Sequence, residues 1–429
     1  MRVLMFGWEF PPHIAGGLGT ACKGIVEGLA HNGVETLFVM PSASGDEDQS
    51  CTTIINASDV EVHNVSQTVD EFLDKVKFIH VDSNLVPYVD PDECFEAIEK
   101  MKKEKRTSTT VGFGQKFKFS GKYGANLMEE VSRYAQVGGT IAMQHAGEFD
   151  VIHAHDWLTY LAGIAAKELS GKPLVVHVHA TSFDRGSDDM VDTRVYAIEK
   201  RGMEMADRVV AVSELTRNIV INKYGIDPSK VVAVHNAVDF SGRENLQVER
   251  GVRDKVVTFL GRITYQKGPE YFIDAAAKVL KRTKGVRFVM AGSGDMMNKA
   301  IRQVARLGIA DRFHFTGFLR GSDVQKMFAL SDVYIMPSVS EPFGISPLEA
   351  MRSNVPSIIS YQSGAAEILK YAFKVDFWDV DAMADDIYAL LQYPALSKFA
   401  EKHGLEEVNA LKWDHAAAKL KTIDEQIIK

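Results

Sequence analysis

The chain contains 429 residues, of which 46% are hydrophobic and 25% are charged, and this ordinary globular composition excludes a largely disordered or fibrous protein. The formal net charge of −8 argues against a general affinity for nucleic acid or anionic membranes, which requires clustered Lys and Arg. The cysteines Cys22, Cys51 and Cys94 lie far apart, so they build neither a disulfide framework nor a zinc site. The first apolar run is too short for a signal peptide, and no apolar stretch reaches the roughly 18 residues of a membrane span. These features predict a cytoplasmic protein without a transmembrane segment.

Short apolar runs, many of them rich in β-branched residues, alternate with helical patterns along the whole chain. Such runs predict buried parallel strands with helices on both faces of the sheet. Two series of strands fit two doubly wound domains better than one very wide sheet, so we expect an α/β protein with two Rossmann-like domains. The expected strands are Val3–Phe6, Thr36–Val39, Phe78–Val81, Val151–Ala154, Leu174–Val178, Val209–Val212 and Val231–Val234 in the first series, and Val256–Leu260, Val286–Ala291, Phe313–Gly317, Val333–Met336 and Ser357–Ile359 in the second.

A polar, charged stretch at 237–255 separates the two series. We therefore expect an N-terminal domain over 1–245 and a C-terminal domain over 246–405. Residues 406–429 form a predicted helical tail, with Trp413 as an apolar anchor, that packs back on the first domain. The segment 102–122 mixes Lys and Arg with Gly and Phe and predicts a flexible insertion, either a solvated loop or a lid that contacts the acceptor.

The segment Glu341-Pro-Phe-Gly-Ile-Ser-Pro-Leu-Glu349 follows an expected strand of the second series. Ligands of open α/β sheets collect at the carboxyl ends of the strands. Gly344 allows close approach of the backbone to a ligand, and amides at a helix start can hold an anion. Glu349, one turn into the helix, can accept hydrogen bonds from two ribose hydroxyls. The plainer interpretation is a capped helix start with a solvated glutamate.

A second loop, Gly261-Arg-Ile-Thr-Tyr-Gln-Lys-Gly268, directly follows the strand Val256–Leu260. Arg262 is a two-pronged hydrogen-bond donor and Lys267 a mobile point charge, a combination suited to a diphosphate. An isolated surface pair would be solvated, but two such loops at one edge of a sheet indicate a nucleotide site.

A third loop carries glycines at the start of the first helix, Gly16-Gly-Leu-Gly19. The third position of a dinucleotide fingerprint is Cys22, and no acidic residue follows the second strand, which argues against a nicotinamide cofactor. We therefore expect this loop to be a glycine turn that binds phosphate at the start of the helix.

Histidines end two neighbouring strands, as His153-Ala-His-Asp-Trp157 and His177-Val-His179. We expect a polar cluster that contacts a sugar, with buried histidines bonded to backbone as the alternative. No carboxylate–histidine set completes a metal site there, so no metal is predicted.

Together these motifs resemble the retaining glycosyltransferases of GT-B fold, especially family 4 and the glycogen and starch synthases. The opening Trp8-Glu-Phe-Pro-Pro and the His153-Ala-His-Asp-Trp157 segment are similar to the synthases of α-glucan. The resemblance implies two domains facing a central cleft. It also implies transfer of a hexose, glucose in the synthases, from UDP- or ADP-glucose to an α-1,4-glucan, with no metal or other cofactor. One departure is Ile14, where the synthases usually carry Lys.

The resemblance also implies roles for single residues. The implied catalytic set is His155, Arg262, Lys267 and Glu341. His155 would touch the donor sugar and Glu341 would lie by its hydroxyls, while Arg262 and Lys267 would neutralise the diphosphate. The remaining implied contacts are Gly16 and Gly17 at the diphosphate, Asn236 along the interdomain cleft, the amides of Gly344 and Ile345 at the phosphate, Glu349 at the ribose, and, more weakly, Asp156 and His179 at the sugar or acceptor.

In the implied reaction the anomeric configuration is retained, and positioned cations stabilise the charge that develops on the departing diphosphate. Attack by a Glu341 nucleophile and same-face attack by the acceptor hydroxyl are both compatible with the pattern. Other readings are a family 4 transferase with a non-glucan acceptor, a GT-B nucleotide-sugar 2-epimerase and a non-catalytic sensor. A GT-A enzyme would instead bind metal at Asp379-Val-Asp381 or Asp90-Pro-Asp92. The nucleotide base, the acceptor and the oligomeric state are left open.

Overall fold

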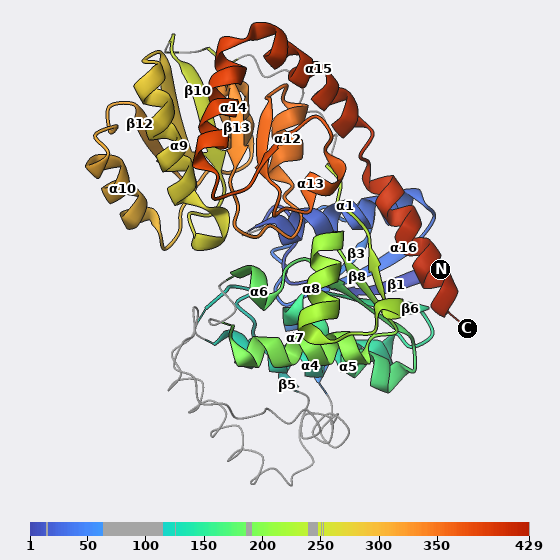
Figure 1. Ribbon diagram of the computed structural model, residues 1–429. Helices are drawn as coiled ribbons and strands as arrows, with labels where there is room; N and C mark the ends of the chain where they lie inside the picture. Colours follow the sequence, from blue (N-terminus) through green and yellow to red (C-terminus); the bar gives the residue numbers. More distant parts are fainter. Residues whose placement is uncertain are drawn as a thin grey trace.

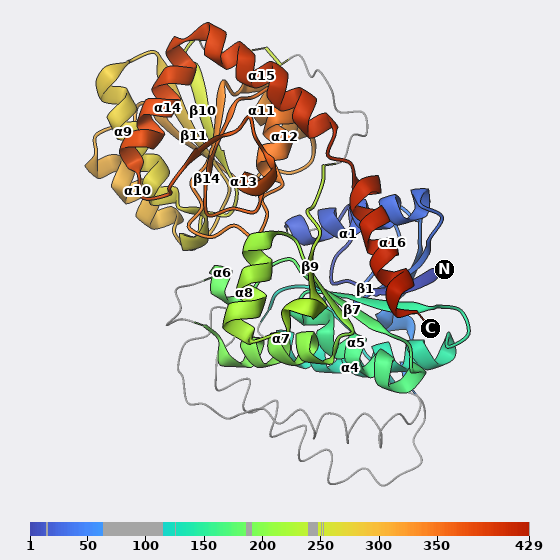
Figure 2. The same cartoon turned by 45° about the vertical axis from the view of Figure 1, so that its right-hand side comes forward.

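A computed structural model describes residues 1–13, 16–62, 115–124, 126–185, 191–238, 248–249, 251 and 253–428. The chain forms two lobes, each with a parallel sheet between layers of helices (Figure 1). Both chain ends lie on the N-terminal lobe, because the last helix returns to it (Figures 1 and 2). The expected strand Phe78–Val81 and the first part of the predicted insertion, 102–114, lie outside the described residues.

The N-terminal lobe contains a seven-stranded sheet with the strand order β3-β2-β1-β6-β7-β8-β9. All of its strand pairs are parallel, so the carboxyl ends of the strands share one edge. The strands are β1 (Arg2–Phe6), β2 (Glu35–Met40), β3 (Thr53–Asn56), β6 (Val151–His155), β7 (Leu174–Val178), β8 (Arg208–Ala211) and β9 (Val231–Ala233). The helices are α1 (Gly17–His31), α4 (Leu127–Gln144), α5 (Trp157–Ser170), α6 (Ser182–Arg185), α7 (Thr193–Met205) and α8 (Glu214–Tyr224), with the short turns η1 (Ala57–Asp59) and η3 (Pro228–Lys230).

Two hydrophobic layers hold this sheet. Helices α4, α5, α7 and α8 cover one face, and α1 and the C-terminal helix cover the other. The small antiparallel pair β4 (Glu61–Val62) and β5 (Gln115–Lys116) lies apart from the main sheet. Phe119 just after it is buried in the core, and the Glu130 carboxylate accepts hydrogen bonds from the amides of Ser120 and Gly121. The end of the predicted insertion is therefore fixed to α4.

The C-terminal lobe contains a six-stranded parallel sheet with the order β12-β11-β10-β13-β14-β15. Its strands are β10 (Lys255–Leu260), β11 (Val286–Ala291), β12 (Phe313–Gly317), β13 (Val333–Met336), β14 (Ser357–Ser360) and β15 (Phe373–Val375). Its helices are α9 (Pro269–Arg282), α10 (Met297–Arg306), α11 (Ser322–Leu330), α12 (Ser346–Arg352), α13 (Ala365–Ile368), α14 (Val380–Gln392) and α15 (Pro394–Asn409), with the turn η4 (Tyr265–Lys267).

Local chemistry explains the helix that leaves the central strand β10. Pro269 occupies the first turn of α9, where its missing N–H costs nothing, and Arg282 complements the helix dipole in the last turn. Phe272 and Val279 are fully buried against the sheet. Strands β10 and β13 are neighbours, so the loops that follow them lie side by side at the carboxyl edge.

Every expected strand within the described residues is a strand of one of these two sheets, and the predicted α/β class with two Rossmann-like units is confirmed. The edge strands β3 and β15 were not expected. The half-buried β3 and the three-residue β15 lack the apolar runs that mark the central strands.

The C-terminal helix α16 (Trp413–Ile427) crosses back to the N-terminal lobe and packs on α1, as expected (Figure 2). Two glycines make this close approach possible: a Cβ at Gly24 would lie 2.2 Å from the Trp413 ring, and one at Gly28 would lie 2.7 Å from the Trp413 carbonyl oxygen. The Lys421 ammonium donates to the Asn32 carbonyl at 2.9 Å at the far end of α1.

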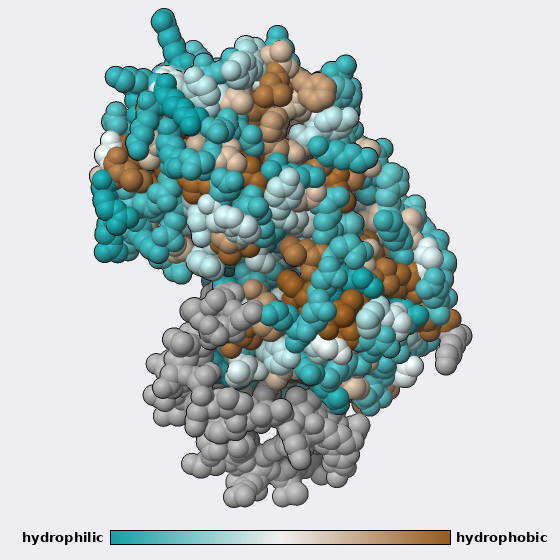
Figure 3. Space-filling view, viewed as in Figure 1, coloured by the Kyte–Doolittle hydropathy of each residue, from teal (hydrophilic) through white to brown (hydrophobic). Residues whose placement is uncertain are grey.

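The two lobes also touch at their junction, where the outline of the molecule narrows (Figure 3). The Glu367 carboxylate of α13 accepts hydrogen bonds from the amides of Glu214 and Leu215 at the start of α8, at 2.9 and 2.7 Å. Glu367 also lies 2.6 Å from the His235 Nε2. These bonds lower the pKa of Glu367 below its usual value although burial opposes them. Along the described chain, none of the helices has both the length and the hydropathy of a bilayer span.

Candidate active site

The loop after β10 carries the two cations that the sequence singled out. Lys267 ends the turn η4, and Gly268 follows in a left-handed conformation with φ 64°. A Cβ on Gly268 would lie 2.0 Å from the Pro337 carbonyl oxygen of the loop after β13. Only glycine fits this approach, which brings the Lys267 loop against the Glu341 loop.

The Lys267 ammonium forms an ion pair and hydrogen bond with the Glu341 carboxylate. Glu341 is only 6% exposed, and its second described partner is the Ser338 hydroxyl, which donates at 3.3 Å. Two residues 74 positions apart in sequence thus meet at the carboxyl edge of the C-terminal sheet. An ammonium held on a buried carboxylate is positioned in advance for an anionic ligand that enters this edge.

The rest of the Glu341 segment continues along the same edge. Gly344 has φ 94°, and a Cβ there would lie 3.1 Å from the Glu341 Cγ, so this turn needs glycine. Ile345 then caps α12, and Glu349 lies half-buried in the first turn of that helix. Gly344, Ile345 and Glu349 are therefore brought together with Glu341.

The N-terminal lobe presents the start of α1. Gly16 caps the helix, and a Cβ added at Gly16 or Gly17 would meet nothing within 4 Å, so both face open space. The buried Glu9 carboxylate accepts a hydrogen bond from the Gly19 amide at 3.1 Å. Because helix starts attract anions, this carboxylate satisfies one amide and leaves the open glycines for a ligand. Glu9 lies within the opening motif but was not singled out as a site residue.

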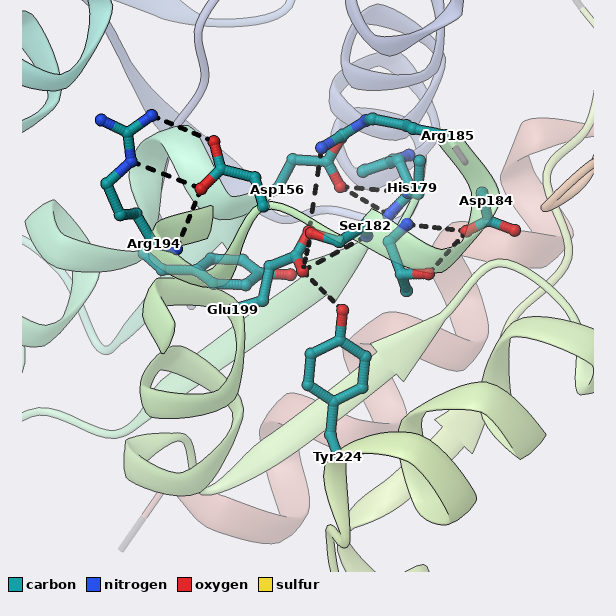
Figure 4. Close-up of polar contacts among 12 residues, drawn as sticks. Asp156, His179, Ser182, Asp184, Arg185, Arg194, Glu199 and Tyr224 are labelled. Carbon is teal, nitrogen blue, oxygen red and sulfur yellow. Dashed lines mark hydrogen bonds and ion pairs between the residues drawn. The ribbon is translucent and has the colours of Figure 1, made fainter. Parts of the chain in front are cut away.

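Asp156 joins the ends of β6 and β7. Its Oδ1 accepts hydrogen bonds from the amides of His179 and Ala180 at 2.8 and 3.2 Å (Figure 4). Its backbone has φ 61° and ψ 167°, a region that costs a residue with a side chain about 1–3 kcal/mol. The fold holds Asp156 in this conformation, and the carboxylate in turn holds the His179 backbone.

His155 lies further inside than the sequence implied. Strand β6 runs one residue beyond the expected end at Ala154 and includes His155, which is 0% exposed. Its Nδ1 lies 2.9 Å from the Nε2 of the half-buried His179. Burial lowers the pKa of both imidazoles, so both rings are neutral at pH 7. His179 thus stands between His155 and the edge of the sheet.

Asn236 is also buried and lines a small cavity together with His177, His179 and Trp413. The open volume of about 10 Å³ is close to the minimum for one water molecule. The structure places Asn236 beside the histidine cluster, at the junction of the lobes.

A polar cluster that the sequence did not indicate surrounds Glu199 (Figure 4). Its carboxylate accepts hydrogen bonds from the hydroxyls of Tyr224 and Ser182, and Arg185 lies 3.8 Å away. Burial raises the pKa of Glu199 to about 7. The partners of Glu199 are separated from it by 14 to 25 positions, so no local motif marks them.

One further contact links the lobes near this cluster. The Ser340 hydroxyl, one residue before Glu341, donates to the buried Asp184 at 2.6 Å. Burial raises the pKa of the Tyr123 hydroxyl in the N-terminal lobe, Glu9 and Asp156 raise it further, and Arg185 and Arg262 lower it.

The Asp379-Val-Asp381 string has a structural role. The Asp379 side chain caps α14 by accepting from the Ala382 amide, and Asp381 forms an exposed ion pair with Lys278. This use of both carboxylates contradicts the GT-A reading of that string. Asp90-Pro-Asp92 lies outside the described part of the chain.

Two Rossmann-like lobes, with cations at the strand ends of one and a glycine-flanked helix start on the other, form a GT-B fold. Sequence profiles agree. Residues 124–241 match the profile described as Glycosyltransferase Family 4, and residues 243–405 match Glycosyl transferases group 1. The chain belongs to glycosyltransferase family 4, and it is a retaining transferase that uses a nucleotide-sugar donor.

Relatives of similar length match most of the chain. An uncharacterized glycosyltransferase of Methanocaldococcus jannaschii is 29% identical over 86% of this chain and 83% of that protein. A glycogen synthase of Mycobacterium tuberculosis is 24% identical over 86% of this chain and 80% of the synthase. Among solved structures, the sucrose-phosphate synthase of Thermosynechococcus elongatus has a TM-score of 0.71 at 16% identity, covering 99% of this chain and 98% of that one.

Proposed function

We propose that this enzyme transfers glucose from UDP- or ADP-glucose to an α-1,4-glucan, with retention at the anomeric carbon. The likeness to a glycogen synthase over most of both chains supports the acceptor. A donor of this kind is supported by the Anabaena HepE structure in complex with UDP and glucose, which has a TM-score of 0.66 at 16% identity over 99% of this chain and all of HepE.

The observation that carries the donor side is the Lys267–Glu341 pair at the edge shared by β10 and β13. In the proposal, Arg262 and Lys267 bind the diphosphate, and each charged hydrogen bond contributes about 1.5–3 kcal/mol. The amides of Gly344 and Ile345 contact the phosphate, and Glu349 accepts hydrogen bonds from the ribose. The open glycines Gly16 and Gly17 face the diphosphate from the other lobe. Asn236 lines the cleft between the lobes.

The proposed chemistry follows from those charges. The bond between the anomeric carbon and the diphosphate oxygen breaks as negative charge collects on the diphosphate, and the two cations stabilise that charge. Glu341, released from Lys267 when the diphosphate takes the ammonium, lies by the hydroxyls of the sugar. The acceptor hydroxyl attacks from the face that the leaving group vacates, and a leaving-group oxygen takes its proton. The cations supply the charge compensation, so the proposal includes no metal or other cofactor.

The acceptor side belongs to the N-terminal lobe. Asp156 and His179 are placed at the sugar, and His155 acts on it through His179. In this proposal, residues 1–245 form an acceptor-side domain, residues 246–405 a donor-binding domain and residues 406–429 a tail that returns to the first domain. Closure of the lobes over the junction would exclude water and limit hydrolysis of the donor.

A panel of nucleoside-diphosphate sugars tests the proposal. Each donor is assayed for hydrolysis alone and then for transfer to glycogen or maltooligosaccharides. Glucose incorporation with retained configuration is the expected result. Transfer to other acceptors but to no glucan would instead favour a family 4 transferase with a non-glucan acceptor. D-inositol 3-phosphate is a candidate acceptor, because a D-inositol 3-phosphate glycosyltransferase of Salinispora tropica is 31% identical over 52% of both chains. A 2-epimerised product formed without acceptor would contradict transfer altogether.

A further inference from the structure

Four histidines line one face of two neighbouring strands. Side chains alternate along a strand, so His153 and His155 of β6 share a face, as do His177 of β7 and His179 just after it. The strands are in parallel register, with His155 opposite His177. His153, His155 and His177 are completely buried, and only His179 reaches the edge of the sheet.

Close contacts join these rings to the C-terminal helix. The Asp424 Oδ1 of α16 lies 2.8 Å from the His153 Nε2, and the His153 Nδ1 lies 3.1 Å from the His177 Nε2. The His177 ring stacks on His155, with centroids 4.2 Å apart and an interplanar angle of 18°. The bond from the His155 Nδ1 to the His179 Nε2 completes a chain from α16 to the cleft edge.

An unpartnered ring nitrogen in this chain fixes where the protons of His155 and His179 are. The His155 Nε2 is buried and has no hydrogen-bond partner among the described residues. A proton on that nitrogen would be a buried donor without an acceptor, which is rarer and costlier than an under-used lone pair. The proton of neutral His155 therefore lies on Nδ1 and is donated to the His179 Nε2. Neutral His179 then carries its own proton on Nδ1, the nitrogen that is not bonded to His155.

A metal ion is the alternative use of the cluster, since ring nitrogens of His153, His155 and His177 lie within 4.8 Å of one another. Two of these rings are already hydrogen-bonded to each other at 3.1 Å, and the Asp424 carboxylate bonds to the outer nitrogen of His153. Hydrogen bonds already use both ring nitrogens of His153 and the Nε2 of His177, so we favour hydrogen bonding over metal ligation.

We propose that His155 is a positioning residue that holds His179 in one orientation and one tautomer, with its Nδ1–H available to the donor sugar. Asp424 and His153 support His155 by fixing the His177 ring on which it stacks. The C-terminal helix would thus do more than cover the sheet, because its Asp424 anchors the chain that ends at the site. The catalytic part of this inference rests on the proposed function; the tautomer of His179 does not.

The test combines spectroscopy with kinetics. Protein labelled with ¹⁵N-histidine gives the tautomer of His179, assigned by its loss in His179→Asn. In the wild type the ring is expected as the Nδ1–H tautomer. His155→Phe keeps the stack on His177 but removes the donor, and Asp424→Leu removes the anchor. His155→Phe is expected to give mixed His179 tautomers. Both variants are expected to lower kcat about tenfold, the size of coupling typical of neighbouring groups, with donor Kd changed less than about twofold.

Two variants serve as matched controls. Asp424→Asn keeps an oxygen that can accept from His153 and is expected to retain the wild-type tautomer and kcat. Glu425→Leu alters the exposed neighbouring position on α16 and is expected to change neither. The Nε2–H tautomer in wild-type protein would overturn the inference, as would an unchanged tautomer in folded His155→Phe or an unchanged kcat in folded Asp424→Leu. One equivalent of a transition metal in the purified protein would overturn it in favour of ligation. If the wild type transfers no sugar, the proposed function fails while the tautomer measurement still decides the positioning chain.

Discussion

Replacing Lys267 by methionine removes the ammonium from the Glu341 carboxylate and keeps most of the aliphatic side chain. Glu341 then retains the longer bond from Ser338 and loses the cation that neutralises it. Loss of one preorganised donor to the departing diphosphate is expected to lower kcat/KM by about 10²–10³. The Lys267 side chain is 21% exposed, so we expect a modest loss of folding stability of about 1–3 kcal/mol, less than for a fully buried pair.

The assay is steady-state transfer from the preferred nucleotide sugar, with binding of the nucleoside diphosphate measured by calorimetry. The matched control is Lys278→Met in the same lobe, which breaks an ion pair whose Lys278 and Asp381 side chains are 38% and 76% exposed. Such a pair contributes little, so this control is expected to keep kcat/KM within about twofold. A folded Lys267→Met enzyme with wild-type kcat/KM would refute the reasoning.

Other parts of the structure give further predictions. Because burial raises the pKa of Glu199 from 4.5 to about 7, the folded state keeps a proton that the unfolded state releases, and stability falls as the pH rises through this range. Glu199→Gln is therefore expected to raise the Tm relative to wild type at pH 8 but not at pH 4, and equal Tm differences at both pH values would contradict this. Gly24→Val places a side chain in the Trp413 ring and should lower the free energy of unfolding in urea by about 1–3 kcal/mol, whereas an unchanged value would show that α16 does not dock there. Glu367→Ala removes the acceptor for two amides at the start of α8, and it should increase the radius of gyration measured by X-ray scattering. An unchanged radius of gyration would show that the lobe junction does not depend on this contact.

The central strands were predictable because buried parallel strands read as continuous apolar runs. The motifs of the C-terminal lobe were predictable for a related reason. Arg262 and Glu341 each follow such a strand, and neighbouring strands bring their loops together. The sequence did not reveal that Lys267 bonds to Glu341, because that contact depends on Gly268 packing against the Pro337 carbonyl oxygen.

The N-terminal half of the site was harder to predict. Strand β6 is one residue longer than the sequence predicted, and this extension buries His155 and leaves His179 nearer the edge of the sheet. An apolar pattern does not define the end of a strand to within one residue. Glu199 is a buried carboxylate whose partners come from α6 and α8, so only the tertiary fold assembles that cluster. Asp424 is further still, 271 positions from His153 on the returning helix.

The structure of the enzyme in complex with a nucleoside diphosphate tests the central claim most directly. The account predicts diphosphate oxygens within hydrogen-bond distance of both the Arg262 guanidinium and the Lys267 Nζ, with the start of α1 facing them from the other lobe. A diphosphate bound elsewhere, with Lys267 still on Glu341 and Arg262 turned away from it, would contradict the account.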